Sequence, residues 1–382
     1  MNLKEQKKSK NRSYFLLLLC SMLIGAVCGI LILKYLVMSD DNLETGEILL
    51  NWAATIIVFY IALYLQIIIH EAGHMIAGLF SGYTFSSFRI GSLMWIKDNK
   101  KIKFRRLSLA GTGGQCLMNP PDMANGKIPF VFYNLGGSLM NLVTIPVCAL
   151  LLICLDKLSL VSLFLLIMCV IGFLYALMNG VPMKFGVVNN DGSNTLELSK
   201  SPEALRSFWI RMKVMELTSK RVRIKDMPDE WFYLPDKNGL KNSMTAGMAV
   251  LYENRLMDEL AFDEAKELID ELLNTETGIV GIHLNMLICD RLYCELIKDK
   301  DSEVIKRLYS KEQIKFMNKM RKFPSVIRTE YAYSLLYLND VKKAAKLKKQ
   351  FEKRAKTYPY ITDIESEREL LEIVDVLIKD CT

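Results

Sequence analysis

The 382-residue sequence predicts a mainly α-helical, polytopic membrane protein with about four spans, an interfacial β-hairpin and a soluble all-α domain. Two observations predict this class. Long uncharged runs crowd into the first half of the chain, whereas almost everything after Lys200 mixes charged residues with scattered apolar ones. A run of about 20 apolar residues is what a helix needs to cross a hydrocarbon core of about 30 Å. The two halves are therefore suited to different solvents.

The first half contains four predicted spans. Residues 1–13 form a basic tail, and residues 14–38 form the first transmembrane helix, in which Lys34 and an apolar tail follow the apolar run in place of a small-residue cleavage site. A second run, residues 48–80, is too long for one perpendicular crossing, so it tilts or emerges at an interface. The third and fourth runs form a tight helical hairpin and cover residues 128–155 and 158–181.

Basic residues near the span ends set the predicted orientation. Residues 1–12 carry five Lys or Arg, whereas the first loop, residues 39–47, carries acids and no basic residue. Residues 97–106 carry six more basic residues. We therefore expect a multi-pass protein of the cell membrane with both termini in the cytoplasm. Because the basic residues lie in short clusters beside apolar runs, the net charge of +7 indicates a lipid bilayer and no nucleic acid as partner.

The motif HEAGH at residues 70–74 places His70 and His74 four residues apart on one helix face, where they can bind one zinc ion. Glu71 can reach a water molecule at the open coordination position, so we predict it as the catalytic base. Two interfacial histidines beside a lipid-facing Glu are the competing interpretation. It is disfavoured because ionisable side chains inside an apolar helix are costly and usually functional. His283, in an amphipathic segment, is interpreted as an ordinary packed or surface histidine.

A catalytic zinc site needs a third protein ligand besides the two histidines. The predicted topology restricts this ligand to the cytoplasmic end of another helix, where the fourth span is followed by Asn190-Asp191-Gly192. Asp191 is the candidate, since no other acid lies between Lys157 and Asp191. Asn-Asp-Gly is also a common surface turn, and this structural role is the alternative.

With these motifs the sequence resembles the site-2 protease family of intramembrane zinc metalloproteases. Three family elements occur in order over about residues 49–196: HExxH, a Gly-rich helix with an Asn, and Asn-x-x-Pro followed by Asp-Gly. They are matched by His70, Glu71 and His74, by Gly136, Gly137 and Asn141, and by Asn179, Pro182, Asp191 and Gly192. The segment from Met183 to Asn190 is longer than the usual family spacing.

The resemblance implies a zinc-dependent endopeptidase that cleaves a membrane-embedded or membrane-apposed protein or peptide, in regulated intramembrane proteolysis or in leader or pheromone processing. Residues 49–196 would be its catalytic core, with zinc near the cytoplasmic face. Asn141 and Asn179 are expected to position the substrate or, alternatively, to make polar contacts between helices. A rival is a binding or immunity protein that keeps the fold without proteolysis, which the intact Glu71 disfavours. A transporter is disfavoured because only one polar cluster interrupts the spans.

Two further segments complete the predicted organisation. Residues 83–110 predict a β-hairpin around Asp98, whose open edge either holds an unwound substrate or only anchors the loop at the interface. Residues 200–382 predict a cytoplasmic domain of amphipathic helices. In it FDEAKEL, DSEVIKRL and VKKAAKL recur about 40 residues apart, somewhat like tetratricopeptide units. We expect this domain to bind a substrate or a regulatory protein partner, or only to stabilise the enzyme.

Overall fold

The computed structural model describes residues 19, 22–23, 25–31, 33–34, 45–98, 101–107, 113–155, 159–185 and 188–379. The first predicted span, residues 14–38, lies largely outside the described residues. The chain divides into two compact units. The first comprises Met1–Gly91 and Leu109–Pro202, and the second comprises Ser92–Ser108 and Glu203–Thr382.

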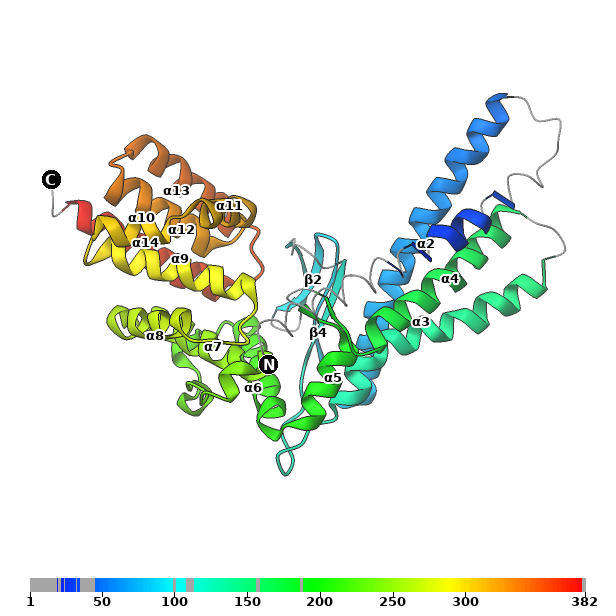
Figure 1. Cartoon of the computed structure of the whole chain (residues 1–382), viewed down its shortest axis with the longest axis horizontal. Helices are drawn as coiled ribbons and strands as arrows, with labels where there is room; N and C mark the ends of the chain where they lie inside the picture. The colour runs from blue at the N-terminus through cyan, green and yellow to red at the C-terminus, as the bar shows by residue number, and fades with distance from the viewer. Residues whose placement is uncertain are drawn as a thin grey trace. The chain divides into compact units, whose positions relative to one another are not determined.

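Three long apolar helices form the frame of the first unit (Figure 1). They are α2 (Thr45–Phe80), α3 (Phe130–Ile153) and α4 (Leu160–Gly180), and each is long and apolar enough to cross a membrane. In the most apolar windows of α2 and α3, only 17% and 28% of the residues are buried in protein, so these surfaces need lipid to cover them. The second, third and fourth predicted spans are thus confirmed as apolar helices of spanning length.

Helices α2 and α3 approach closely because two glycines face each other. A Cβ atom on Gly73 would lie 2.3 Å from the carbonyl oxygen of Gly136, and one on Gly136 would lie 2.5 Å from the carbonyl oxygen of Gly73. A larger residue at either position would push the backbones apart, and such contacts between small residues are typical of helix pairs in membranes. The contact sets the HEAGH motif directly against the GGSLMN segment of α3.

The long segment between Pro182 and Asp191 folds back on itself as a small hairpin. Strand β5 (Lys184–Phe185) pairs antiparallel with β6 (Val188–Asn189). The hairpin closes at its base, where the Asn190 backbone N–H donates to the Met183 carbonyl at 3.3 Å and the Met183 N–H donates to Asn190 Oδ1 at 3.0 Å. The extra residues are therefore looped out, and helix α5 (Asp191–Lys200) begins beside the end of α4.

Four further strands pair antiparallel, two in each unit. In the first unit, β1 (Thr84–Ile90) pairs with β4 (Gly114–Asn119), with an irregularity between Phe85 and Ser87. In the second unit, β2 (Leu93–Asp98) pairs with β3 (Lys101–Arg106), with Asp98 opposite Lys101. The β2–β3 pair is the hairpin predicted around Asp98. The sequence indicated a single hairpin over residues 83–110, and β4 lies beyond that range.

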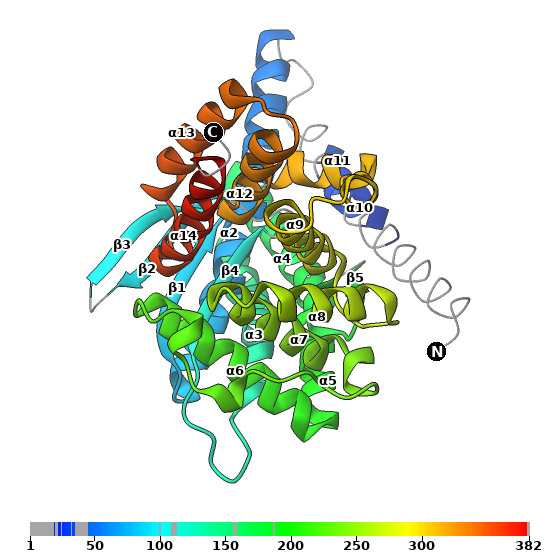
Figure 2. The same cartoon turned by 90° about the vertical axis from the view of Figure 1, so that its left-hand side faces the viewer.

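Helices make up most of the second unit, and several pack as neighbours in sequence order (Figure 2). Ala265 and Ala344 are buried on α8 and α13, whereas Val304 is half-buried on α10, and the repeat interpretation stays a prediction. The helices are α6 (Pro202–Ser219), α7 (Ser243–Asp258), α8 (Phe262–Asn274), α9 (Gly281–Ile297), α10 (Ser302–Leu308), α11 (Lys311–Met320), α12 (Pro324–Ala332) with a π-helical turn (Tyr333–Tyr337), α13 (Val341–Ala355) and α14 (Ile361–Lys379).

The β2–β3 hairpin is fastened to the helices of the second unit. Asp98 accepts a hydrogen bond from Lys103 at 2.6 Å and one from Arg221, just after α6, at 3.1 Å. The hydrogen bond from Lys103, reinforced by Arg221, lowers the pKa of Asp98, so the carboxylate stays charged at neutral pH. Arg354 on α13 donates to the carbonyl of Arg106 at 3.5 Å. The hairpin therefore belongs structurally with the C-terminal helices.

Candidate metal centre

Three ligand atoms converge near the C-terminal end of α2. The Nε2 atoms of His70 and His74 lie 3.2 Å apart, and Asp191 Oδ2 lies 3.2 Å from the first and 3.4 Å from the second. Tetrahedral zinc with bonds of about 2.0–2.1 Å places its ligand atoms about 3.3 Å apart. The three atoms therefore have the spacing of one face of a tetrahedral site, and among the described residues their side chains form a group that could hold a metal ion.

Both imidazoles direct a lone pair towards this point. His74 Nδ1 lies 2.9 Å from the Tyr133 carbonyl oxygen, and His70 Nδ1 lies 2.7 Å from Asn141 Oδ1. Because both partners accept, each ring carries its proton on Nδ1 and leaves Nε2 as an acceptor. Asp191 Oδ2 is buried and has no hydrogen-bond donor among the described residues. Three acceptors that face one another repel, so a cation is the group that this cluster accommodates.

Asn141 holds His70 in this orientation. It is fully buried on α3, and its Nδ2 donates to Gln66 Oε1 at 2.7 Å and to the Gln66 carbonyl at 3.1 Å, which leaves Oδ1 to face His70. Gln66 Nε2 donates in turn to the Met168 carbonyl on α4 at 2.8 Å. One chain of hydrogen bonds thus links three helices to one ligand. Gln66 was not predicted from the sequence, although a polar side chain inside an apolar run is a usable signal.

Asn190 and Gly192 place Asp191 at the histidines. Asn190 Oδ1 accepts from the Ser193 backbone N–H at 2.9 Å and so caps α5. Its Nδ2 donates to the carbonyls of Met178 and Val181, at the end of α4. A Cβ atom on Gly192 would lie 2.2 Å from the Gly180 carbonyl oxygen, so only glycine allows this approach. The Asn-Asp-Gly segment is therefore the anchored start of a helix.

Glu71 lies between the ligands in sequence and packs against the start of β4. Its residue is 8% exposed, and a Cβ atom on Gly114 would lie 2.5 Å from Glu71 Oε1. The Gly114 carbonyl accepts from Arg89 Nη2 at 3.2 Å, and the Tyr133 hydroxyl donates to the Cys116 carbonyl at 3.1 Å. These contacts fasten β4 beside Glu71. Neither β4 nor Gly114 was predicted from the sequence.

The remaining predicted residues lie elsewhere. Asn179, half-buried near the end of α4, donates through Nδ2 to the Tyr175 carbonyl at 3.0 Å. The substrate contacts predicted for Asn141 and Asn179 stay predictions. His283 lies on α9 in the second unit.

Replacing Asn141 with Leu is expected to lower zinc affinity by about 10- to 100-fold, because His70 loses the acceptor that fixes its proton on Nδ1. Asn179→Leu is the matched control: the bond that it removes lies within its own helix, so zinc affinity should not change. Competition with a chromogenic chelator measures both variants. Equal zinc affinity of Asn141→Leu and wild type would contradict the positioning role of Asn141.

Apolar helices of spanning length and an HExxH ligand cluster on one of them define a class, the membrane metallopeptidases. The family model described as peptidase family M50 matches residues 58–355, most of the chain, and the protein belongs to this family. The match confirms the resemblance to site-2 proteases, and its range includes His70, Glu71, His74 and Asp191. No curated protein and no solved structure matches the chain.

Proposed function

We propose that this protein is a zinc-dependent endopeptidase that hydrolyses peptide bonds of membrane-embedded or membrane-apposed substrates. The observation that carries the proposal is the triangle of His70 Nε2, His74 Nε2 and Asp191 Oδ2, which includes both histidines that flank Glu71. When bound there, zinc supplies Lewis-acid chemistry that polarises a carbonyl and makes water more acidic. The hydrogen bonds of Asn141 and Asn190 hold His70 and Asp191 in place, so their side chains need not move to bind zinc.

Glu71 has the role of general base and then of general acid. It accepts a proton from the attacking water and delivers that proton to the amide nitrogen as the C–N bond breaks. Its buried position limits competing hydrogen bonds from solvent. Because Gly114 has no side chain, the backbone of β4 lies within contact distance of the Glu71 carboxylate.

Strand β4 is the element that we propose binds the substrate backbone. It pairs with β1 along one edge and with no other described strand along its second edge. A peptide bond inside a helix is hidden by internal hydrogen bonds, so a substrate must unwind and can then pair with a free strand edge. β4 is favoured over the β2–β3 hairpin because Gly114 of β4 lies against the Glu71 carboxylate. Of the two asparagines, Asn179 is favoured for a substrate contact, since Asn141 is committed to His70 and Gln66.

We also propose a multi-pass topology in the cell membrane with both termini in the cytoplasm, supported by the charge difference between residues 1–12 and residues 39–47. The substrate would be a tethered regulator or a leader or pheromone peptide, and the C-terminal helical domain, residues 200–382, would bind a cytoplasmic protein partner. The rival function, a non-proteolytic binding or immunity protein, is not favoured, because both the ligand set and the base are complete.

Purified wild type is expected to hold one zinc ion per chain, and His74→Ala and Asp191→Ala are expected to lose most of it, because each removes one of three ligands. In parallel, membrane peptides from cells that produce wild type or His74→Ala are compared by mass spectrometry. A full-length membrane peptide should accumulate with the variant. Zinc in the wild type together with identical membrane peptides in the two kinds of cells would favour the non-proteolytic function. A wild type that cannot take up zinc would contradict the proposed metal site.

A further inference from the structure

Helix α13 carries a row of lysines along one face. Five exposed residues recur at spacings of four, three, four and three positions, which places them on one side of the helix over about 21 Å. We call this row the lysine stripe. The opposite side of α13 is buried through Ala344, Leu347 and Phe351. The stripe consists of Lys342, Lys346, Lys349, Lys353 and Lys356, the last just after the final residue of α13.

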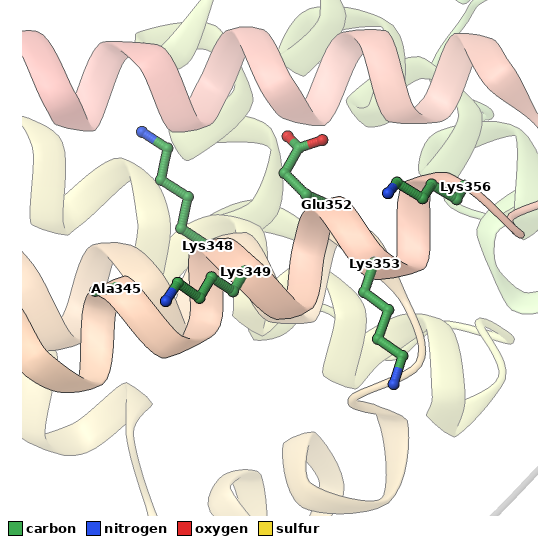
Figure 3. A pocket seen from close by; sticks show the side chains of 6 residues that line it. All are labelled: Ala345, Lys348, Lys349, Glu352, Lys353 and Lys356. Atoms are coloured by element: carbon green, nitrogen blue, oxygen red, sulfur yellow. The ribbon is translucent and has the colours of Figure 1, made fainter.

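The charge of the stripe is not neutralised within the described residues. No ion pair is formed there by any of its five lysines, whereas neighbouring Lys348 pairs with Asp375 and the acid Glu352 pairs with Arg368 at 3.0 Å. Figure 3 shows a surface hollow on α13 in which Lys348 and Glu352 reach towards a neighbouring helix and Lys353 points to the opposite side. The stripe therefore offers unpaired cations to a partner.

Exposed apolar side chains lie at the start of the stripe. Among the described residues of 203–379, the large apolar side chains with high exposure are those of Leu338, Val341 and Val376. Leu338 is 47% exposed and Val341 is 66% exposed, and Val341 directly precedes Lys342. Two of the three thus lie within the four residues that precede the stripe in the sequence. Lysines beside exposed aliphatic side chains are the composition of helices that lie in a membrane interface.

We propose that the lysine stripe, together with Leu338 and Val341, binds the anionic headgroup surface of the bilayer in which the chain is embedded. Attraction to anionic lipids adds up with each lysine near the surface. The apolar helices of the same chain keep the second unit near a bilayer, so each contact can be weak. A nucleic acid would use the lysines but would leave Leu338 and Val341 exposed to water, and lipid is therefore favoured. This property goes beyond the peptidase activity and does not depend on it.

The test uses the full chain in nanodiscs of phosphatidylcholine alone or of phosphatidylcholine mixed with phosphatidylglycerol. Reductive methylation of each lysine is followed by mass spectrometry. The five stripe lysines are expected to react about fivefold more slowly in the anionic discs. High salt should remove this difference, because the screening length falls to about 3 Å at 1 M. The exposed Lys237, Lys241 and Lys300 should react equally in both discs.

A triple variant tests the additive attraction. Lys346→Gln, Lys349→Gln and Lys353→Gln together should bring the protection of the remaining Lys342 and Lys356 below about twofold. The control triple Lys237→Gln, Lys241→Gln and Lys300→Gln changes the net charge equally and should keep wild-type protection. Equal reaction rates of the wild-type stripe in both discs would overturn the proposal. So would protection that arises only when RNA or duplex DNA is added to phosphatidylcholine discs, since the stripe would then be a nucleic-acid surface.

Discussion

Replacing Glu71 with Gln is expected to leave zinc and fold intact while hydrolysis falls by about a hundredfold to ten-thousandfold, the range for loss of a general base. The amide keeps the shape that fits against Gly114 but cannot accept the proton of the attacking water. Zinc content is measured on the purified variant, and cleavage is measured with the substrate that the comparison of membrane peptides identifies.

Glu47→Gln is the matched control, because it makes the same change on the same helix but at an exposed position in the first turn. It should keep wild-type cleavage. If Glu71→Gln still cuts the substrate at the wild-type rate, Glu71 is not the base and the HExxH mechanism fails. If Glu71→Gln loses zinc as well as activity, Glu71 supports the metal rather than the proton transfer.

Replacing Gly137 with Ala is expected to remove both zinc and activity. The added Cβ atom would lie 2.6 Å from His70 Cε1 and 2.6 Å from His74 Nε2, so both rings would have to leave their positions. Displaced ligands no longer form the triangle with Asp191, and zinc affinity should fall by about 100-fold or more. The chelator competition assay measures this loss directly.

Gly46→Ala serves as the control for Gly137→Ala, since a Cβ atom on Gly46 would meet no atom within 4 Å. Its zinc affinity and cleavage should match those of wild type. Full zinc binding by Gly137→Ala would contradict the close packing of both imidazoles against Gly137 on α3.

The candidate ligand cluster could be predicted from the sequence because its chemistry is carried by side chains, and two of these have a fixed helical spacing. His70 and His74 share a helix face by position alone, and Asp191 follows from the scarcity of acids after the fourth span. The three apolar helices were predictable for a similar reason, since length and apolar composition define a span.

The rest of the site could not be predicted because it acts through backbone atoms or through absent side chains. Tyr133 supports His74 with its carbonyl oxygen, which every residue possesses. Gly114 matters because it leaves room for Glu71, and strand β4 is a six-residue segment without a clear alternation of apolar residues. The chain of hydrogen bonds from Gln66 through Asn141 to His70 depends on the contact between α2 and α3. That contact is set by the packing of Gly73 against Gly136.

The closed base of the β5–β6 hairpin separates the length of this segment from the position of the ligand. Hydrogen bonds between Met183 and Asn190 join the two ends, and Asn190 is anchored to α4 by its own side chain. Asp191 is therefore placed by contacts outside the loop, and doubling the loop would cost only about 0.6 kcal/mol of closure entropy. Residues can accordingly be added to this loop or removed from it without moving the Asp191 carboxylate away from the two histidines. The same hairpin is a suitable place to insert an epitope or a fluorescent label close to the candidate metal centre.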